Sequence, residues 1–447
     1  MFLIVMILGV LALPRRWALL PLLIGIHFFP LTQEVEIAGV QMYGIRILLL
    51  FYLVRHFVRS ESRPIEKTTL DRVVVYYCIG ALLLSIAREP GRSGIMAGLG
   101  ASADFALVYF FTRHFIHTRE DVQGAMISLL ITSCIMGFFM LVEMRREENP
   151  FSFLGTVHEM TQVRDGKLRC QGAFAHPITA GLAGASLLGP LLLWAWSQPR
   201  RNFMLLLAGG STVATAIASG SSAPVLTLGF AAMALVIWNW REHTRLMLKL
   251  CVLGAIGLHC VMKAPVWHLI GRLSDITGGT GFHRVQIIDQ AINHFSEWWL
   301  TGTTVTAHWL DFRTLPNDPN NVDITNQYVA EGVTGGLIRM FLFMWLLREA
   351  FLLCGKARAQ AEATGRMDRA WLSWGWGVCL FAHVTAFISV CYYDQLHHMI
   401  PMTFAIIAGV HDEILRADSQ ETYAGAPAAA PQENLDWMSE AAEGPHA

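Results

Sequence analysis

Residues 225–238 read VLTLGFAAMALVIW and contain no charged side chain. A second uncharged run, VVVYYCIGALLLSI, occupies residues 73–86. The whole chain has 447 residues, of which 54% are hydrophobic and 15% charged, whereas an average soluble domain is about 25% charged. Because a helix rising about 1.5 Å per residue needs roughly 20 apolar residues to cross the hydrocarbon of a bilayer, the sequence predicts an all-α, polytopic membrane protein.

The apolar segments predict twelve or thirteen membrane helices, of which the first two are short for full crossings. They span residues 1–13, 17–31, 36–58, 70–87, 95–117, 121–143, 176–197, 202–219, 222–240, 246–264, 333–353, 371–391 and 396–411. We therefore expect one transmembrane domain over residues 1–411. The segment 412–447 is acidic and contains an Ala/Pro tract, so it cannot build a core and is expected to be a disordered tail.

Basic residues mark every second connection between these segments. The basic connections contain Arg15 and Arg16, Arg55 to Arg72, Arg113 and Arg119, Arg200 and Arg201, Arg241 to Lys249, and Lys356 to Arg369. Positively charged loops are retained in the cytoplasm, so we expect these loops and the tail to lie inside. The loops 144–175, 219–222, 265–332 and 391–396 then face outward, although Arg88, Arg92, Arg145 and Arg146 fall in outward loops.

Charge and motif content exclude several classes of function. The net charge is −1, so no bulk electrostatic attraction to nucleic acid is expected. The chain has no Asp-x-Asp, GxGxxG, HExxH or Gly-x-Ser-x-Gly motif, and we therefore expect no metal and no nucleotide cofactor. Its eight cysteines lie mostly in apolar segments and form no CxxC, which favours buried apolar residues over a disulfide framework.

The first candidate site precedes the apolar segment at 176–197. It reads RCQGAFAHP over residues 169–177. Pro177 suits a first helical turn, where its missing N–H costs nothing. Arg169 offers a planar fork of donors to a phosphate group, and His176 stands beside it. The alternative is that both side chains only cap the helix and reach to the membrane interface.

The second candidate site is the long polar stretch 265–332. It carries His283, Arg284, His308, Asp323, Asn326 and Glu331. Apolar residues at helical spacing over 285–295 predict an amphipathic helix along the membrane interface, with Arg284 at its start. Arg46 and Glu143 fall inside or at the edge of apolar segments, where a charged side chain usually faces a cavity or a partner. Arg46 is the stronger functional candidate of the two.

Taken together, these features resemble the O-antigen ligase and Wzy-type polysaccharide polymerase superfamily. The resemblance rests on Arg46 in an apolar helix, Arg169…Gly172…His176-Pro177, the Ser219–Ser222 connection, Arg284 before the amphipathic helix, Trp299-Leu300-Thr301-Gly302, and Asn326…Glu331-Gly332…Gly335. It implies a GT-C-like fold in the bacterial inner membrane, with a large periplasmic loop at 265–332 and the active site on the periplasmic face.

The resemblance also implies a chemistry. Family members transfer a glycan from undecaprenyl pyrophosphate to an acceptor saccharide, with inversion and without a metal. Their partners are the lipid-linked glycan, the bilayer and other polysaccharide assembly proteins. On this basis Arg169 and Arg284 hold the pyrophosphate. The other residues of the expected substrate-binding set are Arg46, His176, Asn326 and Glu331.

Two departures from the family pattern bear on the reaction. Thr325 precedes Asn326, where the family often has a histidine, and Gly302-Thr303-Thr304 breaks the usual Gly-x-Gly. Both favour a polymerase for exopolysaccharide or O-antigen over a ligase that acts on a lipid A core. The catalytic base is then expected among His308, His283 and Asp323. A flippase or transporter of lipid-linked saccharides, and a non-catalytic assembly subunit, are the remaining alternatives; transporters more often show repeated halves, which this sequence lacks.

Overall fold

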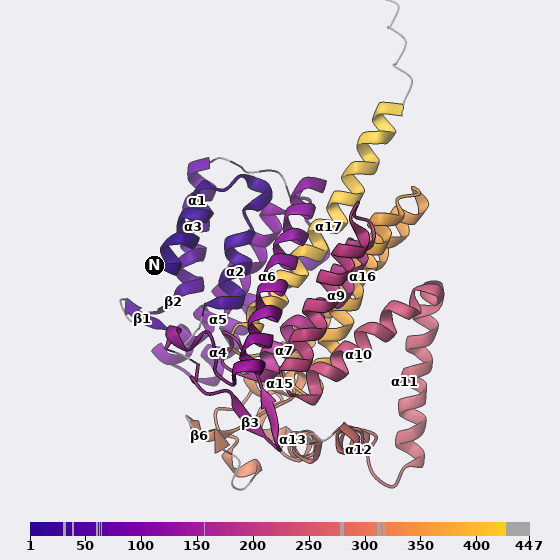
Figure 1. Ribbon diagram of the computed structural model, residues 1–447. Coiled ribbons are helices and arrows are strands. Elements are labelled where there is room, and N and C mark those ends of the chain that lie inside the picture. The colour runs from indigo at the N-terminus through magenta and orange to yellow at the C-terminus, as the bar shows by residue number, and fades with distance from the viewer. Residues whose placement is uncertain are drawn as a thin grey trace, which may run out of the picture.

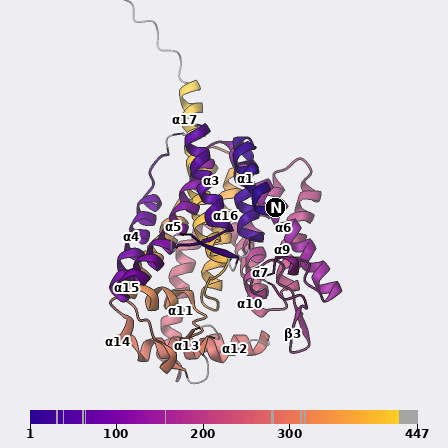
Figure 2. The ribbon, with the colours of Figure 1, turned by 90° about the vertical axis from the view of Figure 1, so that its left-hand side faces the viewer.

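The computed structural model describes residues 1–29, 33–37, 40–59, 61, 63, 65–155, 157–277, 281–310, 314–315 and 318–425. Over this part the chain is a bundle of α-helices with three two-stranded antiparallel hairpins (Figure 1). The short helices α12 and α13 and the hairpin strands β3 and β6 lie at the lower end of the bundle in Figure 1, whereas α17 runs out of the upper end. Figure 2 shows the same separation of the two ends from the side.

Among the described residues, five helical stretches are long and apolar enough to cross a membrane. They are α4 (Thr69–Arg88), α5 (Arg92–Phe115), α6 (Arg119–Arg146), the pair α7 (Pro177–Ser186) and α8 (Leu188–Trp196), and the run of α10 (Ser222–Val236), η3 (Ile237–His243) and α11 (Thr244–Val261). The chain is thus a helical membrane protein, as the sequence predicts. The larger number of crossings and the GT-C-like arrangement stay predictions.

The remaining elements complete the bundle and its loops. The helices are α1 (Phe2–Ala12), η1 (Arg15–Trp17), α2 (Leu20–Phe28), α3 (Gly44–Arg59), η2 (Ser152–Leu154), α9 (Arg201–Ala218), α12 (His268–Thr277), α13 (Gly281–Asn293), α14 (Phe295–Trp298), η4 (Ala307–Trp309), α15 (Gln327–Ala363), α16 (Met367–Ala386) and α17 (Leu396–Gly425). The strands pair as β1 (Glu34–Ile37) with β2 (Val40–Tyr43), β3 (Gln162–Arg164) with β4 (Lys167–Arg169), and β5 (Thr314–Leu315) with β6 (Asp318–Val322).

The expected helix over 36–58 is wrong at its start, because the β1–β2 hairpin occupies that part. Polar Glu34 and Glu36 alternate there with apolar residues, which is the period of a strand. Glu34 pairs with Tyr43 and Ile37 with Val40. Helix α3 begins only at Gly44, and its 16 residues are short for a full crossing.

Helix α15 begins earlier than expected and bends at two glycines. It starts at Gln327, so that Glu331 lies on the helix rather than in the preceding loop. Gly336 has a φ of 67°, and a Cβ there would overlap the Leu300 carbonyl oxygen. The N–H of Leu337 donates to the Trp299 carbonyl at 2.8 Å. The Trp299–Leu300 segment therefore packs directly on the bend, which gives this motif a structural role.

Helix α17 continues past the expected end of the transmembrane domain at 411. Asp412 and Glu413 are buried rather than part of a solvated tail. Asp412 pairs with Arg113, and Glu413 pairs with Arg369 at 2.9 Å. These ion pairs explain why two acidic residues extend the ordered helix. Residues 426–447 of the expected tail lie outside the described residues.

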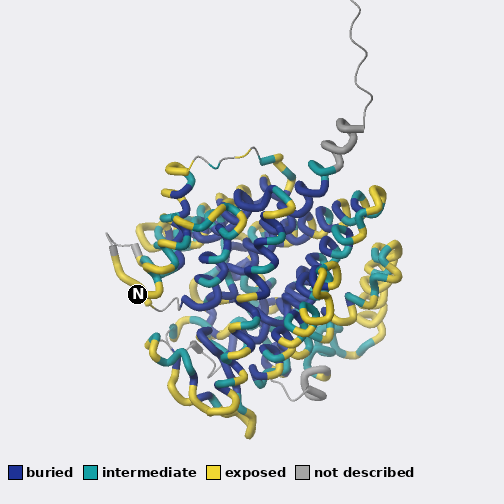
Figure 3. Tube along the Cα trace, turned by 45° about the horizontal axis from the view of Figure 1, so that its top comes forward, coloured by how far each residue is buried: buried dark blue, intermediate teal, exposed yellow. Residues whose placement is uncertain are grey.

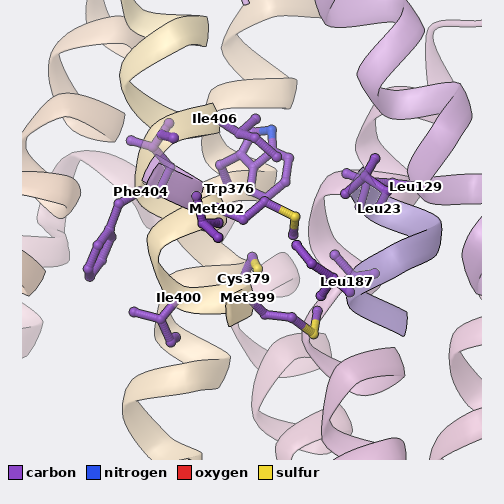
Figure 4. Packing of buried hydrophobic residues seen from close by; sticks show 14 of the residues in the cluster. Leu23, Leu129, Leu187, Trp376, Cys379, Met399, Ile400, Met402, Phe404 and Ile406 are labelled. Atoms are coloured by element: carbon purple, nitrogen blue, oxygen red, sulfur yellow. The ribbon is translucent and has the colours of Figure 1, made fainter. Parts of the chain in front are cut away.

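The apolar core lies along the centre of the bundle, where Figure 3 shows most of the buried positions. Trp376 of α16 packs there with Met399, Met402 and Ile406 of α17, and Leu187, at the junction of α7 and α8, lies nearby (Figure 4). Helix α11 differs from its neighbours in that none of its residues is buried. Figure 1 shows it standing apart from the bundle, joined at its lower end to α12.

Candidate functional site

Four loops that are far apart in the sequence meet at the lower end of the bundle. The Cys170 N–H donates to the Ala218 carbonyl at 3.0 Å, and the Gln395 side chain donates to the Ala173 carbonyl at 2.8 Å. The Asn326 side chain donates to the Ile388 carbonyl at 3.1 Å. These are the loops that the basic residues predict on one side of the membrane. Their position outside the cell stays a prediction.

A β-hairpin carries the first predicted arginine. Its turn residues Asp165 and Gly166 have φ angles of 52° and 72°, as a type I′ turn requires. Arg169 is the last residue of β4 and lies against the connection between α9 and α10. There Gly220 has a φ of 56°, and a Cβ would overlap the Leu168 carbonyl oxygen. The bare glycine thus lets the hairpin reach the helix connection.

The Arg169 guanidinium is buried and has only a neutral partner. It donates to the Ser221 hydroxyl from Nε at 3.3 Å and from Nη2 at 3.0 Å. No carboxylate forms an ion pair with it in the described part of the chain. Burial lowers the pKa of Arg169, as does the charge of Arg164, yet an arginine stays protonated in proteins. A buried cation without a counter-charge is costly, so this position favours an anion.

Glu143 of α6 holds the backbone beside Arg169. Its fully buried carboxylate accepts the Gln171 N–H at 3.2 Å and the Gly172 N–H at 2.8 Å. The Thr161 hydroxyl donates to it at 3.3 Å. Three donors satisfy this charge, so Glu143 positions the loop rather than facing substrate.

His176 caps α7 and is neutral. Its Nδ1 accepts the Ile178 N–H at 3.1 Å. Burial, followed by the nearby charges of Arg169 and Arg164, lowers the pKa of His176 to about 4. Because the cap requires an unprotonated Nδ1, we assign the ring proton to Nε2. The imidazole is therefore a hydrogen-bond donor at neutral pH, and it cannot at the same time serve as a base through Nε2.

Asp394 joins this group, although the sequence did not single it out. Its carboxylate accepts the Ala175 N–H at 2.7 Å, and its own backbone has a φ of 56°. Burial raises the pKa of Asp394 to about 6, against the opposing effect of hydrogen bonds from the Ala175 and Gln395 N–H groups. The available signal was the polar run YYDQ at 392–395 between two apolar segments.

Asp323, in the long loop 265–332, lies within electrostatic reach of Tyr393, the neighbour of Asp394. His283 at the start of α13 contacts the Asp323 carbonyl oxygen through Nε2 at 3.0 Å. The Asp323 side chain is exposed. Burial raises the pKa of Tyr393, and the charges of Asp323 and Asp394 add to that rise, whereas Arg169 opposes it.

Tyr393 thus lies within electrostatic reach of both Arg169 and Asp323. Its ring centroid lies 6.2 Å from that of His176. We name Arg169, His176, Asp323, Tyr393 and Asp394 the outer cluster. It unites residues from the β3–β4 hairpin, the N-terminus of α7, the long loop and the loop before α17.

Arg284 follows His283 and is buried at the start of α13. Burial lowers its pKa. Helix α13 matches the amphipathic helix that the sequence predicts over 285–295, and Figure 1 shows it lying across the end of the bundle. Arg284 is thus the sequence neighbour of His283, whose ring contacts the Asp323 carbonyl oxygen.

The structure places two other predicted residues in interior ion pairs. Arg46 donates to both oxygens of Asp104 at 2.8 Å, and Tyr43 also donates to Asp104. Glu331 accepts from Arg339 at 2.7 Å and from Gln327 at 2.8 Å. Their charges are already neutralised within the bundle, which favours a structural role for Arg46 and Glu331.

Asn326 also has a structural task. Its side chain accepts the Val329 N–H at 3.1 Å and so caps α15. The same side chain ties that helix start to Ile388 in the loop after α16. Asn326 thus orients the outer loops without pointing a free group at the cluster.

His308 lies beside the C-terminal end of α13, whereas His283 lies near the start of that helix. Its Nε2 contacts the Glu297 carboxylate at 2.9 and 3.1 Å, and its ring lies 5.0 Å from that of His294. His294 is eleven residues beyond His283 along α13, or roughly 16 Å at 1.5 Å per residue. Of the three bases that the sequence suggested, His308 is therefore the one that lies at the opposite end of α13 from Arg284.

The sequence contains no metal motif, yet among the described residues the fold brings one group of metal-ligand type together. Suitable ligand atoms of His294, Glu297 and His308 all lie within 4.8 Å of one another. Burial acts to raise the pKa of Glu297, but hydrogen bonds from Trp309, His294 and His308 lower it to about 2. The carboxylate is thus ionised at neutral pH.

Fold and site together define a helical membrane protein with a polar cluster at one end of its bundle, in which the cation Arg169 is buried. Its geometry can hold an anionic group at Arg169, and Tyr393 lies within electrostatic reach of both Arg169 and the Asp394 carboxylate. Comparison with protein-family models and with curated proteins finds no match for this chain.

Proposed function

We propose that the protein is an inverting, metal-independent membrane glycosyltransferase that polymerises undecaprenyl-pyrophosphate-linked oligosaccharide repeats for an exopolysaccharide or O-antigen. One observation supports this most directly: Arg169 is a buried cation whose hydrogen bonds go to the Ser221 hydroxyl alone among the described residues. A pyrophosphate would supply the missing negative charge through paired hydrogen bonds to the guanidinium. The proposal places this end of the bundle on the periplasmic face of a bacterial inner membrane.

In the proposed reaction, the hydroxyl oxygen of an acceptor sugar attacks the anomeric carbon of the lipid-linked donor. The bond from that carbon to the pyrophosphate oxygen breaks, and the electron pair leaves with the pyrophosphate. Arg169 and Arg284 stabilise the leaving charge, and His176 donates a hydrogen bond through Nε2. The hydroxyl proton passes to a carboxylate, and we assign that role to Asp394.

Asp394 suits the base role better than the other carboxylate of the cluster. Burial moves its pKa to about 6, and a base is most effective when its pKa is near the working pH. Asp323 is exposed, and its carbonyl oxygen already positions His283. In this arrangement Asp323 helps to hold the long loop against the site.

Analysis of lipid-linked glycans from a deletion strain tests the reaction class. We expect single lipid-linked repeats to accumulate on the outer side of the membrane, because a missing polymerase leaves them unjoined. Long lipid-linked chains that are not attached to lipid A core would point to a ligase instead. Single repeats trapped on the cytoplasmic side would point to a flippase.

Replacement of Asp394 by Asn tests the site. Loss of a general base typically costs a hundred- to ten-thousandfold in rate, so D394N should form almost no polymer at normal abundance in the membrane. The matched control is D165N, because Asp165 is an exposed carboxylate in the nearby hairpin turn. Equal polymer yield from D394N and D165N would remove Asp394 from the reaction.

A further inference from the structure

Three side chains converge in the long loop, at the end of α13 opposite His283. Glu297 Oε1 lies 2.7 Å from His294 Nδ1, and Glu297 Oε2 lies 2.9 Å from His308 Nε2. His294 and Glu297 are three residues apart across the junction of α13 and α14, and His308 comes from η4. The ligand atoms thus come from the α13–α14 junction, from α14 and from η4.

The surroundings hold these side chains in place. The Trp309 ring stacks on the His294 ring, with centroids 5.5 Å apart and planes inclined by 10°. Trp309 Nε1 also donates to Glu297 Oε2 at 3.1 Å. The Trp309 N–H in turn donates to the Thr306 carbonyl at 2.9 Å. A fixed ring orientation and a hydrogen-bonded carboxylate are the features that support metal ligands in proteins.

The donor set suits a borderline divalent ion. Two imidazole nitrogens and one carboxylate oxygen form a common ligand set for Zn²⁺. Ligand atoms about 2.0–2.1 Å from a tetrahedral zinc lie roughly 3.3 Å from one another, so the two contacts to Glu297 need only a small expansion. On binding, the imidazole protons that point at Glu297 move to the other ring nitrogens, and the carboxylate supplies the negative charge.

The group is also accessible. The side chains of His308, Glu297 and His294 are 48, 34 and 27% exposed, so an ion can enter from solvent and a water molecule can complete its coordination. The nearby pair His268 and Asp289, with Nε2 and Oδ2 3.1 Å apart, offers similar groups. It has no third ligand in the described part of the chain.

We propose that His294, Glu297 and His308 form a Zn²⁺-binding site that joins α13, α14 and η4 and so stabilises the fold of the long loop. The ion would lie at the end of α13 opposite His283 and Arg284. It therefore acts on the loop and takes no part in the transfer chemistry, which stays metal-independent.

Metal content of the purified full-length protein tests the proposal. The protein should be prepared without a histidine tag, stripped with a chelator and titrated with Zn²⁺ alone. We expect one zinc per chain in the wild type. Mutation of a supporting residue typically weakens metal affinity 10–100-fold, so loss of a ligand in E297Q or H308A should weaken it by at least about tenfold. H268A is the matched control and should bind as the wild type does.

Two results would overturn the site: no zinc bound by the stripped wild type, or equal affinity in wild type, E297Q and H308A. Should the variants fail to fold, the visible spectrum of the Co²⁺-substituted wild type decides. Tetrahedral nitrogen and oxygen ligation supports the site, and the spectrum of the fully hydrated ion contradicts it.

Protease protection separates this site from the transfer reaction. Zn²⁺ should slow cleavage within the loop of the wild type and H268A but not of E297Q. Polymer formation by chelated wild type should persist under conditions in which the loop stays intact. Unchanged cleavage of the wild type with Zn²⁺ would contradict the stabilising role, whatever the outcome for polymer formation.

Discussion

Two buried arginines at opposite ends of the bundle, Arg113 and Arg169, have different partners. At the upper end, Arg113 pairs with Asp71 at 3.4 Å and with Asp412, and Arg241 pairs with Glu362 at 2.5 Å. At the lower end, Arg169 donates to the Ser221 hydroxyl and forms no ion pair with a carboxylate of the described chain. Both Arg113 and Arg169 are buried, so burial alone does not distinguish them.

The difference teaches how to tell a structural arginine from a binding one. A buried arginine that faces carboxylates of its own chain is neutralised and contributes to the fold, whereas one that faces only a hydroxyl keeps its charge available for a ligand. On this criterion Arg46, which pairs with Asp104, belongs with Arg113. The following experiments test whether the criterion holds.

Arg113→Ala should cause the largest change, and it should be a change in stability. Removing one partner of a buried ion pair typically costs about 3–5 kcal/mol, here because Asp71 and Asp412 would be left without their cation. Unfolding of the purified protein in detergent measures this cost. The control is Arg119→Ala, whose pair with Asp368 is largely exposed and is worth about 0–1 kcal/mol. Similar losses in both variants would refute the distinction.

Arg169→Ala and Arg284→Ala should instead affect the reaction. Loss of a donor that stabilises transition-state charge costs about 2.7–4 kcal/mol, or a hundred- to thousandfold in rate. Lysine at either position keeps the charge but not the planar fork, so it should restore only part of the polymer. Polymer yield and length at matched membrane abundance are the measurements.

Exposed arginines nearby provide the controls for these variants. The control variants are Arg164→Ala and Arg272→Ala. Arg164 lies in the same hairpin as Arg169, and Arg272 lies on α12, next to the helix that carries Arg284. Both controls should form normal polymer. If Arg169→Lys forms as much polymer as the wild type and Arg169→Ala lowers the yield only slightly, Arg169 only reaches to the membrane interface.

Glu143→Ala should have an intermediate effect on both stability and polymer. Hydrogen bonds to a charged group contribute about 1.5–3 kcal/mol, and this variant leaves the Gln171 and Gly172 N–H groups without their acceptor. Glu143→Gln keeps one carbonyl oxygen and should be milder. Unfolding in detergent and polymer yield can be compared with Glu148→Ala, an exposed neighbour. Normal polymer from Glu143→Ala would show that Arg169 needs no such support.

The smallest effect concerns pH. A carboxylate acts as a base only when deprotonated, and burial raises the pKa of Asp394 to about 6. The transfer rate should therefore be halved near pH 6 and fall about tenfold for each further unit of acid. The profile of the purified enzyme measures this. A rate that stays constant down to pH 4 would exclude Asp394 as the base. Asp323 would then be the carboxylate to test next.

Much of the fold was predictable because its signals are local. Helices α4 and α6 begin at capping boxes, Thr68 with Asp71 and Thr118 with Asp121, and both lie within a few residues of the predicted segments. The β1–β2 hairpin was missed because a short alternating run next to an apolar helix looks like its continuation. The continuation of α17 past residue 411 was missed because Asp412 and Glu413 find partners on distant helices.

The site was predictable only in part for the same reason. Arg169 and His176 stand in one short segment with a helix start, so sequence alone associates them. Asp394 is more than two hundred residues away from both, and only the hydrogen bond to Ala175 brings it to them. Likewise, Arg46 looked functional because its partner Asp104 lies 58 residues further along the chain.

The pairing of Arg113 also sets an order for the assembly of the protein. Synthesis proceeds from the N-terminus, so Arg113 enters the membrane long before Asp412, which follows 299 residues later. During that interval Asp71, on the adjacent helix α4, is the acidic partner within reach at 3.4 Å. Helix α17 then brings Asp412 to Arg113 and completes the charge balance of α5. A chain truncated ahead of Asp412 would carry an arginine with only one of its two acidic partners.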